Sequence, residues 1–308
     1  MKKHLMAALG IMLIGGSATA TPAEPGDPAT GSTIVYSRSA AEHDLGRAAE
    51  IFAMQEDGSG MRRLTDNRRR DDYPALSPDG TLIAFSRKID GQFDLFVMST
   101  NGENRRRLTR TPEGDEVLAA WAPDGTALAF TVTTNTPGGW QSDIYRMTLS
   151  DRRVQRLTFT PRAQEFTPAW APDDSEIAFT KFNLRRHRYG IASVNPNAGG
   201  LRWIVVNPRS GDGYADANPS WSPDSQWLVF ARDHGSDPYV DLYKIRRDGS
   251  DVTAVTDLSG LAEDPDWGSD GRILFRYEEG LAIVTDRGGT PEQITPVRSG
   301  LPYWSPDW

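Results

Sequence analysis

The sequence predicts an all-β protein, namely a six-bladed β-propeller of four-stranded blades that the C-terminal strand closes by completing the first blade. The first observation is a short phrase that returns at intervals of about 45 residues, the repeat length of a propeller blade. The second is turn punctuation, since 29 Gly and 21 Pro in 308 residues break the chain into many short apolar runs. The aligned positions of the phrase are Leu76, Trp121, Trp170, Trp221, Trp267 and Trp304.

Two segments precede the repeats. Residues 1–20 carry Lys2 and Lys3, then an apolar run, and end in the small residues Ala18-Thr19-Ala20, as a secretory signal peptide does. Residues 21–31 are rich in Pro, Gly and small side chains, which predicts a flexible leader. The domain is therefore expected to span residues 32–308.

Each unit is predicted to contain four short strands, A to D, as the unit at 72–110 illustrates. Ser77-Pro78-Asp79-Gly80 places Ser, Pro and Gly where a type I turn prefers them, between strands A and B. Strand B is apolar on both faces throughout the repeats, so both faces are expected to be covered by neighbouring blades. The predicted strands of this unit are Tyr73–Leu76, Thr81–Ser86, Asp94–Met98 and one that ends in Arg107–Thr109.

The two ends of the repeat region are complementary. The first unit begins at a strand B, Thr33–Tyr36, and the last ends in a strand A, Pro302–Asp307. Ser305–Asp307 and Gly31–Ile34 together are expected to rebuild the turn between strands A and B. This closure would remove exposed sheet edges.

The repeats resemble the β-propeller of the TolB family, whose blades carry a Pro-x-Trp-Ser-Pro-Asp-Gly phrase and a closing Leu-Thr. The phrase stands here at Pro168–Asp173 and Pro219–Asp224, and the closing pair at Arg107–Thr109 and Arg156–Thr158. The resemblance implies a propeller that acts in the cell envelope, where the family's propeller docks a peptidoglycan-associated lipoprotein. The α/β domain that precedes the propeller in TolB is expected to be missing. Similar propellers also precede hydrolase domains in prolyl-oligopeptidase-type enzymes.

Composition excludes some classes of function. The net charge of −8 disfavours a nucleic acid or an anionic membrane as partner. Cysteine is absent, so an exported domain must rely on a large core instead of disulfides. We expect a monomer without membrane insertion, located in the periplasm or secreted.

Binding is expected on the face formed by the D-to-A and B-to-C loops, because these loops differ between units while the turns of the other face repeat. Tryptophan and arginine are the residue types enriched at binding hot spots. The alternatives are a Trp lid over a neighbouring blade and a solvated Arg loop. The candidates on B-to-C loops are Trp140, Arg185, Arg186, His187, Tyr189, His234 and Tyr239.

The D-to-A loops carry an acidic series that would form a ring at the channel mouth. It could attract a basic partner surface or hold Ca²⁺, the single cofactor considered. Alternatively, the carboxylates accept hydrogen bonds from loop backbone or nearby arginines. The series consists of Asp71, Glu116, Glu165, Asp216 and Glu263.

Catalysis finds little support in the sequence. The histidines after the signal segment, His43, His187 and His234, lie in three different units, and motifs for nucleophilic or phosphate chemistry are missing. We therefore expect a non-catalytic propeller, without catalytic or metal-ligating residues, that binds a protein or peptide. The alternatives are a metal-assisted enzyme acting on a carbohydrate or peptide at the channel mouth, and a propeller lectin.

Overall fold

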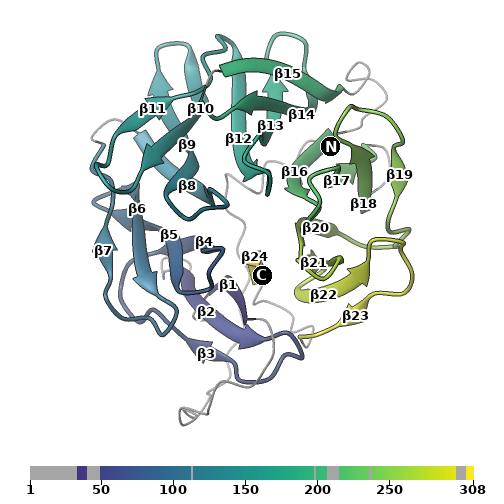
Figure 1. Ribbon diagram of the computed structural model, residues 1–308, viewed down its shortest axis with the longest axis horizontal. Coiled ribbons are helices and arrows are strands. Elements are labelled where there is room, and N and C mark those ends of the chain that lie inside the picture. Colours follow the sequence, from purple (N-terminus) through teal and green to yellow (C-terminus); the bar gives the residue numbers. More distant parts are fainter. Residues whose placement is uncertain are drawn as a thin grey trace.

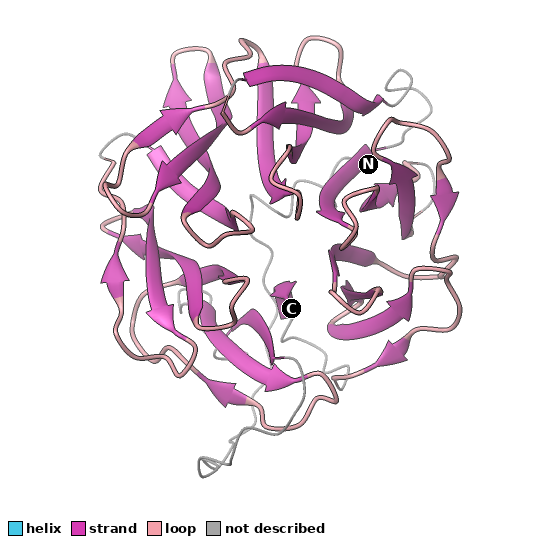
Figure 2. Cartoon of the chain, in the orientation of Figure 1, coloured by secondary structure: helices cyan, strands magenta, loops and turns pink. Residues whose placement is uncertain are grey.

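The computed structural model describes residues 33–39, 49–111, 114–197, 199–206, 215–235, 238–295 and 303–308. The predicted signal peptide at 1–20 and leader at 21–31 lie outside these ranges. The regular elements in the described ranges are β-strands, arranged around a central axis as a propeller (Figures 1 and 2). Among the described residues, no helix is long and apolar enough to cross a membrane.

Four sheets are four-stranded blades, in which the strands follow one another from the inner to the outer edge. The first contains β24 (Tyr303–Asp307), β1 (Thr33–Ser39), β2 (Ala49–Gln55) and β3 (Arg62–Arg63). The second contains β4 (Asp71–Leu76), β5 (Leu82–Ile89), β6 (Gln92–Ser99) and β7 (Arg106–Arg107). The third contains β16 (Ala215–Trp221), β17 (Trp227–Asp233), β18 (Val240–Arg246) and β19 (Thr253–Ala254). The fourth contains β20 (Ala262–Trp267), β21 (Arg272–Tyr277), β22 (Gly280–Thr285) and β23 (Glu292–Gln293).

The prediction of six four-stranded blades is wrong, because the strands between the second and third of these blades form one continuous eight-stranded sheet. The junction is a parallel pairing of β10 with β12, in which Ser142 lies opposite Gln164. The sheet contains β8 (Gly114–Trp121), β9 (Ala127–Thr136), β10 (Gly139–Thr148), β11 (Val154–Arg156), β12 (Ala163–Trp170), β13 (Ile177–Asn183), β14 (Arg188–Asn195) and β15 (Gly199–Val206).

The physical reason for the junction is the length of the β9–β10 hairpin. The repeat pattern predicts a loop at residues 133–142, yet most of them continue the strands. The hairpin turns at Pro137-Gly138, and the β-branched run Thr131–Thr134 suits extended backbone. The longer β10 then reaches β12, where the Gln141 side chain donates to the carbonyl of Ala163 at 2.9 Å.

Every inner strand contains a bulge at which one residue adopts a positive φ. Register shifts in all the inner pairings mark the bulges. A bulge bends the strand and redirects a side chain, here at the level of the channel wall. The residues with positive φ are Tyr73, Leu118, Thr167, Asn218, Asp264 and Ser305, with φ between 45° and 59°.

The pairing of β24 with β1 shows how the repeat region meets its own beginning. Its register differs from the expected one. Asp307 lies opposite Val35, as Ala75 lies opposite Ala84 in the second blade. Pro306 therefore lies inside the inner strand and lines the channel instead of forming a turn.

Trp308, and not Trp304, therefore takes the position of the repeated tryptophan. Its backbone N–H donates to Oδ2 of Asp266 at 3.0 Å, and the guanidinium of Arg272 lies 4.9 Å from its ring centre. With this alignment the last interval becomes closer to the other repeat lengths. The correction moves the last copy of the phrase by four positions in the sequence.

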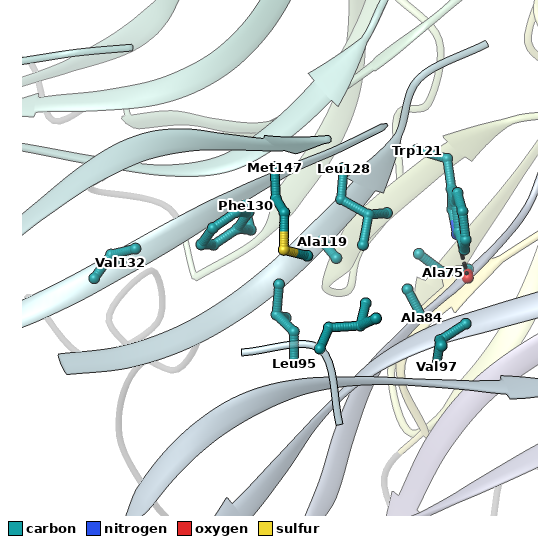
Figure 3. Close-up of a cluster of buried hydrophobic side chains, with 11 residues drawn as sticks. Ala75, Ala84, Leu95, Val97, Ala119, Trp121, Leu128, Phe130, Val132 and Met147 are labelled. Carbon is teal, nitrogen blue, oxygen red and sulfur yellow. Dashed lines mark hydrogen bonds between the residues drawn. The ribbon is translucent and has the colours of Figure 1, made fainter. Parts of the chain in front are cut away.

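The core lies between adjacent sheets. Between the second blade and β8–β10, Leu95 and Val97 face Leu128, Phe130 and other apolar side chains (Figure 3). Full burial of side chains of this size stabilises a fold by about 1.5–3 kcal/mol each. The Trp121 indole N–H donates to the carbonyl of Ala75 at 2.9 Å across the same junction (Figure 3).

A closing threonine fastens the outer strands β3, β7, β11, β19 and β23, whereas β15 ends in Val205-Val206. The hydroxyl of Thr109 accepts the N–H of Leu95 at 2.9 Å, and the same bond recurs from Ile144 to Thr158. Glycine lets the backbones of neighbouring sheets approach closely. An added Cβ on Gly102 would lie 2.8 Å from the carbonyl oxygen of Leu64 in the preceding sheet.

Candidate functional site

The loops between β-strands fall on two faces because the strands within each sheet alternate in direction. The hairpin loop of β9–β10 shares its face with the β11–β12 connection, and the same holds around the ring. We call this the loop-rich face. The opposite face carries the short turns, such as Ser77–Gly80, in which the N–H of Gly80 donates to Ser77 at 2.8 Å.

The acidic series is buried within the inner strands, with exposed fractions of 8% or less. Four of its members face a basic residue that lies directly opposite on the next strand. Arg87 Nε lies 2.6 Å from Asp71, and Arg232 Nε lies 2.7 Å from Asp216. The two other pairs are Glu165 with Lys181 and Glu263 with Arg276.

Glu116 is the exception, because β9 places Val132 opposite it instead of a base. It accepts a hydrogen bond from the Thr111 hydroxyl, and burial raises its pKa. The five carboxylates are thus buried and bonded to neighbouring residues, and they do not form an exposed acidic ring. The described residues contain no group of three or more His, Asp or Glu side chains that could hold a metal ion, and Ca²⁺ at the mouth stays a prediction.

Trp140 lies near the tip of the β9–β10 hairpin, opposite Asn135, with 55% of its surface exposed. The side-chain amide of Gln164 donates to its carbonyl at 3.1 Å. This bond connects the hairpin to the start of β12. Phe159, which the sequence analysis did not select, follows β11 on the same face and is 73% exposed. The guanidinium of Arg156 lies 4.2 Å from its ring centre.

The β13–β14 loop has an ordered basic tip. The N–H groups of Arg185 and Arg186 both donate to the side-chain carbonyl of Asn183, at 3.1 and 3.0 Å, and both arginines are exposed. His187 is also exposed, with a φ of 48°. Tyr189 lies inward, stacked on Phe182 at 4.2 Å, and burial raises its pKa.

The remaining candidates do not join this group. His234 lies 3.7 Å from Asp241 and packs against Tyr243 in the third blade. Tyr239 is 38% exposed, next to β18. His43 lies outside the described residues. The histidine and tyrosine of the third blade thus belong to the connection between β17 and β18, and not to the hairpin of Trp140 or to the basic loop.

Hydrogen bonds connect the hairpin, the β11–β12 connection and the basic loop into one surface. Gln141 and Gln164 connect the first two segments, and the N–H of Leu184 donates to the carbonyl of Arg162 at 2.9 Å. The exposed side chains on this surface combine two large aromatic groups with three guanidinium groups. We call it the aromatic–arginine patch: Trp140, Phe159, Arg162, Arg185 and Arg186.

A cavity of about 310 Å³ lies in the channel, on the side of the short turns, and the sequence analysis did not anticipate it. Its acidic wall comes from Asp264, Asp266 and Asp307. Burial raises the pKa of Asp264 to about 6. Burial also raises the pKa of Asp266 and of Asp307, and the charge of Asp266 adds to the shift of Asp307. The signal in the sequence was the repeated Pro-Asp-Trp at 265–267 and 306–308.

Comparison with known proteins supports the architecture. Residues 68–271 match the family model of the TolB beta propeller domain. The chain is 32% identical over 108 residues to dipeptidyl-peptidase 5 of Porphyromonas endodontalis, which is 35% of this chain. It is 32% identical over 71 residues to the Tol-Pal system protein TolB of Nitrosospira multiformis, which is 23% of this chain. Each alignment covers 16% of the relative's own length.

Among solved structures, TolB from Acinetobacter baumannii superimposes with a TM-score of 0.68 at 18% sequence identity. The match covers 91% of this chain and 67% of that protein. At this identity the likeness concerns the fold alone. The superimposed part includes the strands that carry the loops of the loop-rich face.

Proposed function

Since this chain belongs to the TolB beta propeller domain family, we propose that it binds a protein or peptide partner through its loop-rich face. The observation that carries the proposal is the aromatic–arginine patch. Its two aromatic side chains expose 55% and 73% of their surface. Exposed aromatic groups beside arginines are the composition of binding hot spots.

The scaffold supports such a role because hydrogen bonds at the ends of the strands hold the loops of the patch in place. The β10–β12 pairing and the bonds from Gln141, Gln164 and the Leu184 N–H hold three connections of one sheet together. A surface that is ordered before binding loses less conformational entropy when the partner arrives. The acidic series has no part in this proposal, since its carboxylates are buried and used within the sheets.

The partner is proposed to be a protein of the exported compartment. The signal-type segment at residues 1–20 predicts export, and one relative is named as a Tol-Pal system protein. The proposed location is therefore the periplasm or the exterior of the cell. Catalysis is not part of the proposed role.

The experiment uses the purified chain as bait for envelope extract, with the captured protein identified by mass spectrometry and then purified. Its affinity is measured for the wild type and for Trp140→Ala/Phe159→Ala. Loss of a hot-spot aromatic group costs about 2 kcal/mol or more, so the double variant should bind at least about 30-fold more weakly.

The matched control is Val154→Ala/Val252→Ala, which removes two exposed apolar side chains beside the short turns of the opposite face. This variant should bind as the wild type does. Equal affinity of the aromatic double variant and the wild type would refute binding through the loop-rich face.

A further inference from the structure

We infer that the segment that docks on the aromatic–arginine patch is acidic, with carboxylates flanking an apolar or aromatic side chain. The inference rests on the proposed function and specifies the chemistry of its partner. It is carried by the charge of the patch, by the order of its backbone and by the pairing of two acids of the same sheet with other bases.

The charges of the patch are not used within the fold. In the part of the chain that the structure describes, Arg162, Arg185 and Arg186 form no ion pair, and all three are exposed. Other arginines of the same sheets are neutralised: Arg156, for example, lies 2.7 Å from Asp143. Three unpaired guanidinium groups in a protein of net charge −8 favour an anionic partner.

Two acids of the same sheet are already paired with bases. Glu165, on β12 below the patch, is paired with the buried Lys181. Asp143 on β10 is buried and paired with Arg156. Neither carboxylate can neutralise the exposed arginines, so the patch retains its positive charge.

The arginines are placed by an ordered backbone. The side chain of Asn183 caps the N–H groups of Arg185 and Arg186, and the N–H of Leu184 bonds to the carbonyl of Arg162. The planar guanidinium group binds a carboxylate with two parallel hydrogen bonds. A partner segment with carboxylates would therefore meet arginines whose backbone is already ordered.

The aromatic side chains of the patch require an apolar side chain in the partner segment. Trp140 and Phe159 present apolar rings that a carboxylate cannot satisfy. An apolar side chain between the carboxylates would cover these rings. The combination distinguishes an acidic peptide from a uniformly charged polymer.

The test uses fluorescent synthetic peptides of equal length in anisotropy titrations with the full chain. One peptide carries Glu and Asp around a Trp, one carries Lys and Arg around it, and one carries Ser and Gln around it. The acidic peptide should bind at least about tenfold more tightly than the others at low ionic strength. Its affinity should fall as salt is added.

The charge-reversed variant Arg185→Glu/Arg186→Glu should lose at least about tenfold in affinity for the acidic peptide. Its matched control is Arg152→Glu/Arg153→Glu, an exposed arginine pair in the turn between β10 and β11, on the face of the short turns. The control should bind the acidic peptide as the wild type does. Circular dichroism checks that both variants are folded.

Equal binding of all three peptides, no binding of the acidic one, or equal losses in both variants would overturn the acidic preference. Equal affinity for heparin and for the acidic peptide would overturn the requirement for an apolar anchor. These outcomes leave the proposed function intact if the captured partner still depends on Trp140 and Phe159. Loss of that dependence would refute the proposed function itself.

Discussion

Removing the carboxylate of Asp71 tests whether the acidic series serves the fold. Arg87 Nε and Nη2 lie 2.6 and 2.7 Å from its two oxygens, and the amide of Asn67 donates to it at 2.8 Å. Asp71 is fully buried and the Arg87 side chain is 12% exposed. The variant Asp71→Ala would leave a largely buried guanidinium without its counter-ion.

Breaking one side of a buried ion pair costs about 3–5 kcal/mol, a large part of a total stability of about 5–15 kcal/mol. We expect Asp71→Ala to lower the free energy of unfolding by that amount and Tm by on the order of 10 °C. The double variant Asp71→Leu/Arg87→Leu should recover much of the loss, because no unpaired charge remains buried.

The assay is urea denaturation followed by tryptophan fluorescence. Asp251→Ala is the control, since Asp251 pairs with Arg246 at 2.5 Å but both side chains are largely exposed. Exposed pairs contribute about 0.2–1 kcal/mol. If Asp71→Ala costs no more than this control, the pair is not a buried structural element and the reasoning about the acidic series is refuted.

Three further predictions concern the channel, the junctions between sheets and the outer strands. The pKa of the Asp307 carboxyl is raised in the fold by burial and by Asp266, so the folded state holds the proton more tightly. Its contribution to stability therefore falls as pH rises above about 4, and Asp307→Asn should be more stable than wild type near pH 8, measured by urea denaturation across pH. Gly102→Ala should cost about 2–4 kcal/mol in the same assay, because φ is 84° and the new Cβ would meet the Leu64 carbonyl. Thr109→Val should cost about 1–3 kcal/mol, because a buried N–H loses its acceptor.

The glycine and threonine changes each have a control elsewhere in the repeats. Gly125→Ala keeps a positive φ of 70° but meets nothing within 4 Å, so it should cost less than Gly102→Ala. Thr126→Val changes an exposed threonine and should be nearly neutral. A wild-type protein that grows more stable between about pH 4 and pH 8 relative to Asp307→Asn would contradict the sign derived for the acidic wall.

Much of the scaffold could be predicted from the sequence because the repeat carries its own turn chemistry. In the copy at Ser77–Gly80 the polar side chains satisfy the turn, with the Ser77 hydroxyl donating to Asp79 at 2.6 Å. Leu-Thr predicted the outer strand, and the hydroxyl bond from Thr109 explains why threonine stands there. Such patterns predict structure well because the residues that form the stabilising bonds lie within one repeat unit.

The errors concern features that depend on contacts between units. The local pattern does not indicate the hydrogen bond from Gln141 to Ala163, so it does not predict the eight-stranded sheet. The last copy of the phrase was assigned from the letters Trp-Ser-Pro-Asp, although Pro-x-Trp at 306–308 matches the inner strand better. A constant repeat length would have favoured the second alignment.

The candidate site was predicted in part. Trp140, Arg185 and Arg186 lie together on the expected face, and Phe159 and Arg162 complete their patch. The sequence could not show that Asp216 faces Arg232, because the pairing partner lies sixteen positions away on another strand. Whether a charged side chain is paired within the sheet depends on the residue opposite it on the neighbouring strand.

The continuous sheet also has a consequence for how the ring opens. The pairing of Ser142 with Gln164 adds backbone hydrogen bonding to one junction, and the parallel bridge of Val240 with Leu261 does the same between the third and fourth blades. Local opening follows the weakest contacts of a fold. Amide hydrogens at these two junctions should therefore exchange with solvent more slowly than those at equivalent positions of the remaining junctions.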